Sequence, residues 1–456
     1  MAGEERVNVS QYLMTEGNIH SKIIRFAVPV FIGHFFQQMY NTVDSLIVGN
    51  LINAEALAAV ASTASYIYLM TAFFMGFAMG AGVVIARHIG ARDDAETGKA
   101  VHTAVGLGLV FSLLMTLCGI FLSPVVLGWM GTPENVMDQA SRYLRVYFSG
   151  SVAIVMYNVF VGILQAAGDS KHPLVYLVIS SVTNIALDLL FIGVFHMGVE
   201  GAALATVFSQ ILSMVLVARL LLTTHESFRL RPRAIRFDRD NMRQIFRYGI
   251  PTALQGCVID LSNMLIQSYI NSFGSQAMAG LGASSKIEGF AFLPVTAFSM
   301  ALTTFISQNM GAQRKERIRE GMRFGLGCTA GMLLVTGALM YIFAPQLITL
   351  FNREPEIIAY GVTRTRICAL FYCLVGFSHT ASAVARGLGK PMTPMVVMLV
   401  CWCFVRVAVL LTIGRVWHDI RLVCWIYPFT WTLSTIVYVV YLNRTTKRML
   451  GTQNTA

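Results

Sequence analysis

Oxygen-bearing side chains recur in three apolar stretches of the first half of the sequence. They are Asp44, Asn184, Asp188 and Thr206. Asn184 and Asp188 are four residues apart, so both would lie on one face of a helix. Two carboxylates, an amide oxygen and a hydroxyl at a similar membrane depth are ligands suited to a small, hard cation such as Na+. Two neighbouring buried carboxyl groups also favour uptake of a proton, so these residue types leave sodium and proton both open.

The four residues are not equally informative. Asn184 and Thr206 have a structural alternative, because lone Asn and Thr side chains in membrane helices commonly form hydrogen bonds to neighbouring helices. Asp44 and Asp188 are harder to explain in this way, since a charged residue at membrane depth is rare and we expect no Lys or Arg of this half to be buried beside them. We therefore expect Asp44 and Asp188 to be functional.

The second half carries a different polar pair, Asp260 and Arg406. Asp260 lies nine residues after Pro251, whereas Asp44 lies fifteen after Pro29. Asp260 should therefore lie about 9 Å further toward the cytoplasmic side, at a rise of about 1.5 Å per residue. Arg406 falls at a similar depth, so a buried Asp260–Arg406 ion pair that fixes helix packing is one expectation. An ion-coupling role for Asp260 is the alternative.

These residues must be held by membrane helices. The chain has 456 residues, of which 55% are hydrophobic and 12% charged, and its mean hydropathy is +0.63; a soluble protein carries about 25% charged residues. A membrane helix needs about 20 apolar residues, and the sequence predicts twelve such segments with no period-2 pattern. They span residues 24–48, 56–86, 99–122, 143–166, 173–195, 201–223, 246–270, 277–307, 322–343, 360–385, 394–414 and 421–442.

The distribution of basic residues predicts the orientation. With the N-terminus inside, 25 Lys and Arg fall in cytoplasmic segments and 7 in outside segments. This bias places both termini in the cytoplasm of a multi-pass cell-membrane protein. It also accounts for the net charge of +11 without a nucleic-acid partner.

The two halves of the sequence repeat each other. KIIRFAVP (22–29) returns as QIFRYGIP (244–251), and GDSKHP (168–173) returns as GKPMTP (389–394). The offset between the two copies is the same at all the later matches and differs by a single position at the first. Because each half has six segments, both halves enter the membrane from the same side, as in transporters with a central cavity between two lobes. The expected parts are an N-lobe (1–223), a cytoplasmic linker (224–244) and a C-lobe (245–456).

The sequence resembles the multidrug and toxic-compound extrusion (MATE) family over essentially its whole length. The resemblance rests on VPVFIGHFFQQMYNTVDSLIVGNL (28–51), LQAAGDSKHP (164–173), TNIALDLLFI (183–192), GAALAT (201–206) and SQNMGA (307–312). Members are typically efflux antiporters that export organic cations in exchange for sodium ions or protons. The resemblance implies an all-α fold of twelve transmembrane helices in two lobes.

The same resemblance bears on the site. It implies that Asp44 is the family's first-helix aspartate, and that Asn184, Asp188 and Thr206 complete the N-lobe cation cluster of one branch. Another branch has acids in the seventh and tenth helices. Here Asp260 is displaced by about one position from the seventh-helix acid of that branch, and the tenth segment has a histidine and no carboxylate. We therefore expect ion coupling in the N-lobe.

These observations predict a proton- or sodium-coupled exporter of lipophilic organic cations that acts as a monomer without a cofactor. One alternative is a flippase for a lipid-linked precursor. Binding its anionic headgroup would require several Lys or Arg side chains that face the cavity. An intramembrane enzyme is the other, but the sequence contains no metal-protease, hydrolase or phosphate-loop motif. The candidate substrate-cavity residues are Gln37, Tyr40, Asn41, Gln255 and His379.

Overall fold

A computed structural model describes residues 12–52, 54–130, 132–417 and 419–450. Within these ranges every regular element is a helix. Both ends of the chain, whose orientation the basic residues predict, lie outside the described residues. The chain divides into two compact units: residues 28–253 form most of the first, and residues 14–27 with those from 254 onward form the second.

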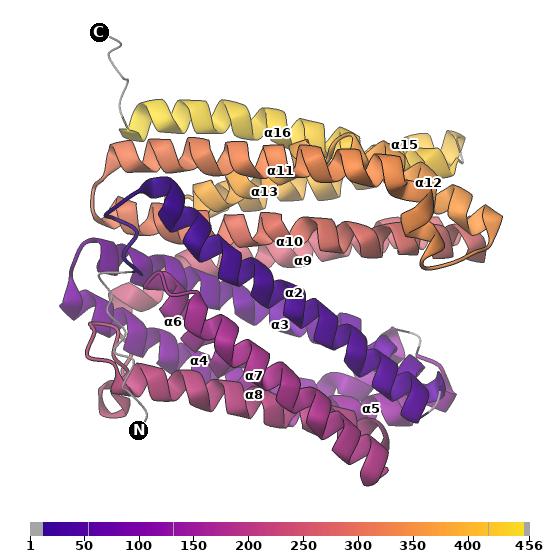
Figure 1. Ribbon diagram of the computed structural model, residues 1–456, viewed down its shortest axis with the longest axis horizontal. Helices are drawn as coiled ribbons and strands as arrows, with labels where there is room; N and C mark the ends of the chain where they lie inside the picture. Colours follow the sequence, from indigo (N-terminus) through magenta and orange to yellow (C-terminus); the bar gives the residue numbers. More distant parts are fainter. Residues whose placement is uncertain (1–11, 53, 131, 418, 451–456) are drawn as a thin grey trace. The chain divides into compact units, whose positions relative to one another are not determined.

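The first unit comprises the helices of the first repeat together with the start of α9 (Figure 1). Its elements are the larger part of α2 (Ile19–Leu51), α3 (Ala54–Gly90), α4 (Asp94–Trp129), α5 (Glu134–Ser149), α6 (Ser151–Ala166), α7 (Lys171–Asp188), η1 (Leu189–Val194), α8 (Gly198–Thr223), η2 (Pro232–Ala234) and the first half of α9 (Arg239–Asn271). In a bilayer core no water is available to bond backbone groups, so long apolar segments satisfy them within helices.

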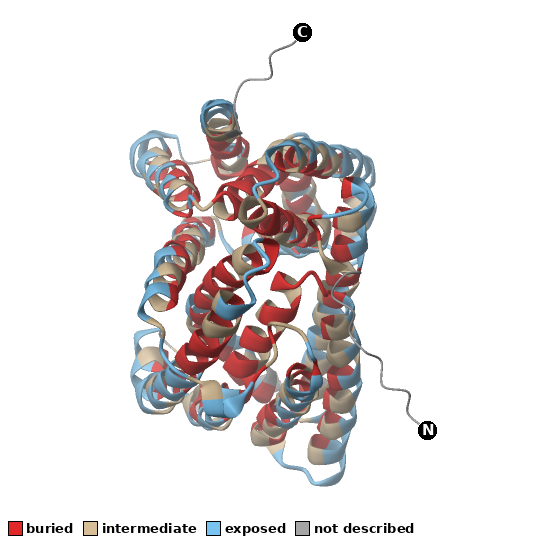
Figure 2. Cartoon of the chain, turned by 90° about the vertical axis from the view of Figure 1, so that its left-hand side faces the viewer, coloured by how far each residue is buried: buried red, intermediate tan, exposed pale blue. Residues whose placement is uncertain are grey.

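The second unit repeats this order. It contains the start of α2, the second half of α9, α10 (Ser275–Gly311), α11 (Lys315–Thr349), α12 (Pro355–Ala369), α13 (Tyr372–Gly387), α14 (Met392–Met398), η3 (Leu399–Phe404), α15 (Val405–Val416) and α16 (Ile420–Leu450). Buried and exposed residues alternate along most helices (Figure 2). The exposed side chains include large apolar ones, such as Phe121 and Leu334 at 72% and 63% exposure, as expected of surfaces that face lipid.

The all-α membrane architecture predicted from the sequence is confirmed. All twelve predicted segments fall on helices or on bent helix pairs. Among the described residues, nine helices are long and apolar enough to cross a membrane, and two bent helix pairs raise the number to eleven. The remaining predicted span, 246–270, lies in α9, which is long enough but more polar.

The internal repeat is visible in the backbone. The first and last residues of α10 follow those of α3 at the same offset as the later sequence matches. The bend of 50° between α5 and α6 likewise corresponds to the bend of 58° between α12 and α13. Even the turn after each bent pair is shared by the halves, since Gly168 and Gly389 both have positive φ, at 91° and 82°. Only glycine adopts this conformation without steric cost.

Each unit contains a short segment from the other repeat. Residues 14–27, the start of the first repeat, belong to the second unit, and the equivalent start of α9 belongs to the first. In the second unit the Met14 N–H donates to Gln308 Oε1 at 2.8 Å, and Arg317 Nη1 donates to the Gly17 carbonyl at 2.8 Å. The two units therefore divide within α2 and within α9 rather than in the loop between the repeats.

In the first unit, α9 packs on α3 at very short range. An added Cβ on Gly80 would lie 2.6 Å from the Gly249 nitrogen and 2.9 Å from the Ile245 carbonyl oxygen. Beside this contact, Arg87 Nη1 donates to the Tyr248 hydroxyl at 2.7 Å. Glycine at position 80 thus sets the separation of the two helices.

The segment predicted as a linker is held against α4. The Asp238 N–H donates to Thr103 Oγ1 at 3.1 Å, and Asn241 Nδ2 donates to Glu96 Oε2 at 3.1 Å. The Asn241 backbone N–H donates to the Asp238 carboxylate at 2.9 Å and holds the pKa of that carboxyl below its usual value. This part of the chain is therefore an ordered component of the first unit.

Candidate functional site

The two aspartates of the first half interact with each other. Asp44 lies on α2 and Asp188 is the last residue of α7, and their carboxyl groups are near enough to interact electrostatically. Asp188 is 0% exposed and Asn184 is 1% exposed. The helical spacing of four residues thus places Asn184 and Asp188 on a buried face of α7, as the sequence predicted.

The buried oxygens of this site lack donors. Five buried polar atoms of the site have no hydrogen-bond partner among the described residues. They are Asp44 Oδ1, both carboxylate oxygens of Asp188, and the oxygen and nitrogen of the Asn184 amide. A buried polar atom without a partner is costly, so the arrangement suits a bound proton or a small cation. The amide of Asn184 can offer its oxygen to the same ion.

Thr206 is less clearly part of the site. It lies on α8 and its hydroxyl donates to the Ala202 carbonyl at 3.1 Å within the same helix. Ser180 Oγ on α7 donates to the Ser209 carbonyl on α8 at 3.0 Å, so these two helices are joined next to the site. No contact described in the structure joins Thr206 to either carboxyl group, so its place in the cation cluster stays a prediction.

The end of α7 has unusual backbone geometry. The α-helix ends at Asp188 and continues as the π-helix η1, Leu189–Val194. A π-turn places one extra residue in the helix and is frequent at functional sites. Here it begins directly after the buried carboxyl, so the helix changes its winding where the site is built.

Two tyrosines complete the surroundings of the carboxyl pair. Tyr40 on α2 and Tyr143 on α5 both interact electrostatically with Asp44 and Asp188. Tyr143 is 6% exposed and stacks on Tyr147 with ring centroids 6.2 Å apart. Sequence reasoning missed Tyr143; the available signal was its spacing of four residues from Tyr147 in an otherwise charged segment.

The candidate cavity residues divide between the two units. Gln37, Tyr40 and Asn41 lie on α2 in the first unit, in line with Asp44 at helical spacing. In the second unit, Gln255 on α9 is buried, and its amide nitrogen donates to Ser382 Oγ at 3.2 Å. His379 on α13 lies edge-on to Trp402 with ring centroids 5.3 Å apart.

The predicted Asp260–Arg406 ion pair is wrong. Arg406 is 1% exposed, but its Nε donates to Thr430 Oγ1 at 3.2 Å and its Nη1 reaches Asn263 Oδ1 at 3.5 Å. Asn263 lies three residues beyond Asp260 on α9, nearly one turn away. The guanidinium instead stacks on the rings of Trp402 and Tyr427, at 5.0 and 4.7 Å from their centroids.

A different ion pair occupies the second unit. Arg364 Nη2 donates to Glu288 Oε2 at 2.7 Å, with the two side chains 4% and 14% exposed. Arg364 Nη1 also donates to Ser285 Oγ at 2.7 Å and to the Leu281 carbonyl at 3.3 Å. The sequence analysis did not predict this pair. The missed signal was that Arg364 lies inside the tenth predicted segment.

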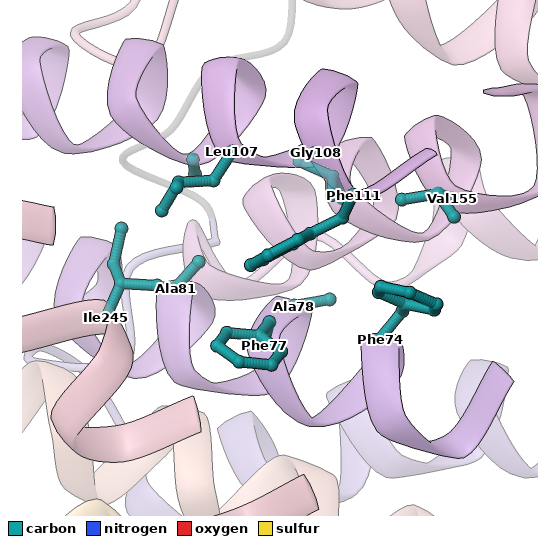
Figure 3. Close-up of a pocket in the computed structure, with 11 residues that line it drawn as sticks. Phe74, Phe77, Ala78, Ala81, Leu107, Gly108, Phe111, Val155 and Ile245 are labelled. Atoms are coloured by element: carbon teal, nitrogen blue, oxygen red, sulfur yellow. The ribbon is translucent and has the colours of Figure 1, made fainter. Parts of the chain in front are cut away.

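The first unit also contains a small apolar pocket (Figure 3). Phe74 and Phe77 from α3 and Phe111 from α4 form much of its wall, together with Val155 on α6 and Ile245 on α9. Its lining carries no charged side chain, so this pocket cannot hold a coupling ion.

Comparison with protein families decides what kind of protein this is. A family profile described as MatE matches the chain twice, at residues 29–190 and 251–412, which together make up more than half of its length. The chain belongs to the MATE family. The two matches are equal in length and keep the offset of the first sequence match, so each repeat of this MATE protein is one copy of the family unit.

Individual relatives agree with this assignment. The probable multidrug resistance protein YpnP of Bacillus subtilis is 29% identical over 396 residues, which cover 87% of this chain and 88% of the relative. The FAD transporter of Shewanella oneidensis is 26% identical over 390 residues, covering 83% and 84% of the two chains. A solved structure of a multidrug resistance MATE transporter in an outward-facing conformation has the same fold, with a TM-score of 0.91 at 23% identity and coverage of 98% and 100%.

Membership of the MATE family makes this chain a multi-pass membrane transporter rather than an enzyme. The carboxyl pair, the tyrosines and the buried arginines are therefore candidates for binding ions and cargo.

Proposed function

We propose that this MATE protein is a secondary active antiporter of the cell membrane that exports lipophilic organic cations or drugs in exchange for protons or sodium ions. The observation that carries the proposal is the pair of carboxyl groups of Asp44 and Asp188, whose buried oxygens have no donor among the described residues. One bound proton or Na+ would compensate one of their two negative charges. The multidrug resistance name of YpnP supports a drug-like cargo.

The proposed mechanism is alternating access coupled at this site. In the outward-open state a proton or Na+ binds the carboxyl pair and lowers its negative charge, which weakens the hold on a cationic cargo and releases it. Asn184 and Thr206 add neutral oxygens if the ion is Na+. Such coupling requires that the ion bind the two conformations with different affinity.

The cargo contacts in this proposal come from both lobes. They are Gln37, Tyr40 and Asn41 in the first, and Gln255 and His379 in the second. Amide, phenol and imidazole groups bind polar edges of a drug, and aromatic faces attract organic cations. We further propose that the protein works as a monomer in the bilayer with both termini in the cytoplasm.

A flippase for a lipid-linked precursor is the alternative. An anionic headgroup needs several uncompensated basic groups. Arg364 is neutralised by Glu288, which leaves the buried Arg406 as a single guanidinium without an ion pair in the described part of this cluster. The first unit supplies two carboxyl groups instead, which favours the antiporter.

The deciding experiment is uptake and release of rhodamine 123, a fluorescent organic cation, by vesicles that contain the purified full chain. A proton gradient and a sodium gradient are imposed separately. We expect one of them to drive movement of the dye. No response to either gradient would remove the antiporter proposal.

The site itself is tested by Asp44→Asn. This change removes a charge from the pair, and we expect gradient-driven efflux to fall by roughly tenfold to a hundredfold, the usual effect of losing a charge-assisted contact. Asp138→Asn is the matched control, because Asp138 is an exposed residue of α5 that pairs with Arg142. Normal efflux by folded Asp44→Asn protein would contradict the assigned site.

A further inference from the structure

The buried polar cluster of the second unit has an excess of positive charge. It contains the guanidinium groups of Arg364 and Arg406 and the carboxylate of Glu288. Glu288 neutralises Arg364 through a contact of 2.7 Å. Arg406 forms no ion pair within the described part of the chain, so one cation is left over in the interior.

The hydrogen bonds of Arg406 do not compensate this charge. Thr430 and Asn263 present neutral oxygens at 3.2 and 3.5 Å, and the longer distance is at the limit of a hydrogen bond. Trp402 and Tyr427 add cation–π attraction. Removal of a guanidinium from water is nevertheless unfavourable unless a counter-charge accompanies it.

The position of this cluster is informative because of the repeat. The offset that relates Gly168 to Gly389 also relates Tyr143, beside the carboxyl pair of the first unit, to Arg364. It relates Thr206 to Tyr427, the ring on which both arginines stack at 5.2 and 4.7 Å. Arg406 itself lies between the positions equivalent to Asn184 and Asp188. The second unit thus has a counterpart of the carboxyl site with the sign of the charge reversed.

We propose that Arg406, with Thr430 and Asn263 beside it, forms an anion site for one monovalent anion, either a carboxylate of the cargo or a free chloride ion. A guanidinium presents donors that match a carboxylate, and the amide nitrogen of Asn263 can donate to the same ion. The Thr430 hydroxyl donates to the Tyr427 carbonyl at 3.0 Å, so it helps to hold the guanidinium in place instead of binding the anion. Arg364 is held by Glu288 and Ser285, so it shapes the site through Tyr427 rather than binding the anion. The carboxylate case adds zwitterionic compounds to the cargo of the proposed antiporter, and that part rests on the proposed function.

The free-ion source is tested on the purified full chain in detergent. Sodium chloride replaces sodium gluconate at constant ionic strength, and the unfolding temperature is followed. A chloride site predicts a saturable rise in wild type, loss of the rise in Arg406→Gln, and retention in Arg415→Gln. Arg415 is the matched control because it is an exposed arginine of the same helix, α15.

The cargo source is tested with two dyes that differ by one ester. Rhodamine 110 has a free carboxylate, and rhodamine 123 is its methyl ester. We expect Arg406→Gln to weaken binding of rhodamine 110 by roughly tenfold to a hundredfold and to leave rhodamine 123 nearly unchanged. Arg406→Lys keeps the charge and should restore part of the affinity, which a merely structural arginine would not do for one dye alone.

The two experiments distinguish results that support the anion site from results that overturn it. A response in either experiment supports the site and names its anion. A wild-type protein that shows no saturable chloride effect and binds both dyes equally overturns the proposal, even if Arg406→Gln fails to fold. Transport of rhodamine 123 by an ion gradient does not involve Arg406, so failure of the antiporter proposal would be seen independently.

Discussion

At the scale of single residues, the acidic side chains within the helices occur in two different environments. Asp44 and Asp188 are two acids without a basic partner among the described residues, whereas Glu288 and Arg364 form a closed pair. A closed pair is stable by itself and has no capacity to bind an ion. An open pair is costly until a cation arrives, which is the property that a coupling site requires.

The closed pair gives a prediction about stability. Glu288→Gln leaves the buried Arg364 guanidinium without a counter-charge, and we expect the free energy of unfolding to fall by about 3–5 kcal/mol. Thermal and denaturant unfolding in detergent would measure the change.

Glu200→Gln is the control for that prediction. Glu200 pairs with Arg142 at 3.6 Å, and both side chains are well exposed, at 38% and 49%. An exposed pair contributes about 0–1 kcal/mol. Equal losses in the two variants would mean that Glu288 and Arg364 are not a buried pair in solution.

Sequence reasoning was uneven at this scale. It placed Asn184 and Asp188 on one face because a spacing of four fixes the face of a helix. It mispaired Arg406, because the partner of a buried arginine depends on the rotation of two different helices, which hydropathy does not encode. Arg364 was missed for a related reason. The count of inside and outside basic residues treats Arg364 as exposed to solvent, although its helix buries it.

At the scale of the helices, contact distance is set by small residues. Gly80 on α3 lies against the backbone of α9, whereas Gly82, two residues along, has its nearest neighbour, the Gly162 carbonyl oxygen, at an ordinary 3.7 Å from an added Cβ. The first position admits no side chain without separating the helices, and the second does.

This difference predicts opposite outcomes for two alanine substitutions. Gly80→Ala should lower the free energy of unfolding by about 1–3 kcal/mol, because overpacking forces the backbone of α9 away. Gly82→Ala should be neutral or slightly stabilising, since alanine favours a helix. Unfolding temperatures of the two variants provide the comparison, and a Gly80→Ala protein as stable as Gly82→Ala would contradict the close contact.

The helices themselves could be predicted almost completely. A bilayer requires long runs of apolar residues and satisfied backbone groups, so all twelve segments are visible in the sequence. The π-helical turn after Asp188 and the bends at the ends of α5 and α12 could not be predicted, because they arise from packing rather than from composition.

At the scale of the whole molecule, the sequence repeat and the compact units do not coincide. The repeats begin at the starts of α2 and α9, but those starts belong to the opposite units. Hydropathy locates a helix without indicating which helices it contacts. The repeat could therefore be predicted, but the exchange of the starts of α2 and α9 between the two units could not.

The exchange predicts where the chain can be cut. A fragment of residues 28–253 keeps the start of α9 on α3, where Phe246 meets Phe77 edge-on at 5.4 Å. A fragment of residues 28–223 ends at the predicted lobe boundary and exposes that face of α3. We expect the longer fragment to elute as a single species in size-exclusion chromatography in detergent and the shorter one to aggregate. Indistinguishable elution of the two would show that α9 is not needed to complete the first unit.

The exchanged segments also bear on how such a chain arose. A six-helix ancestor with one copy of the repeat would have had the same leading segment and no second half to receive it. Such an ancestor would have been complete only as a pair, with each copy covering a helix of the other. Gene duplication and fusion would then join two partners that already depended on each other. By this argument the duplication began from an obligate homodimer with exchanged ends, a common and low-cost route to a symmetric pair.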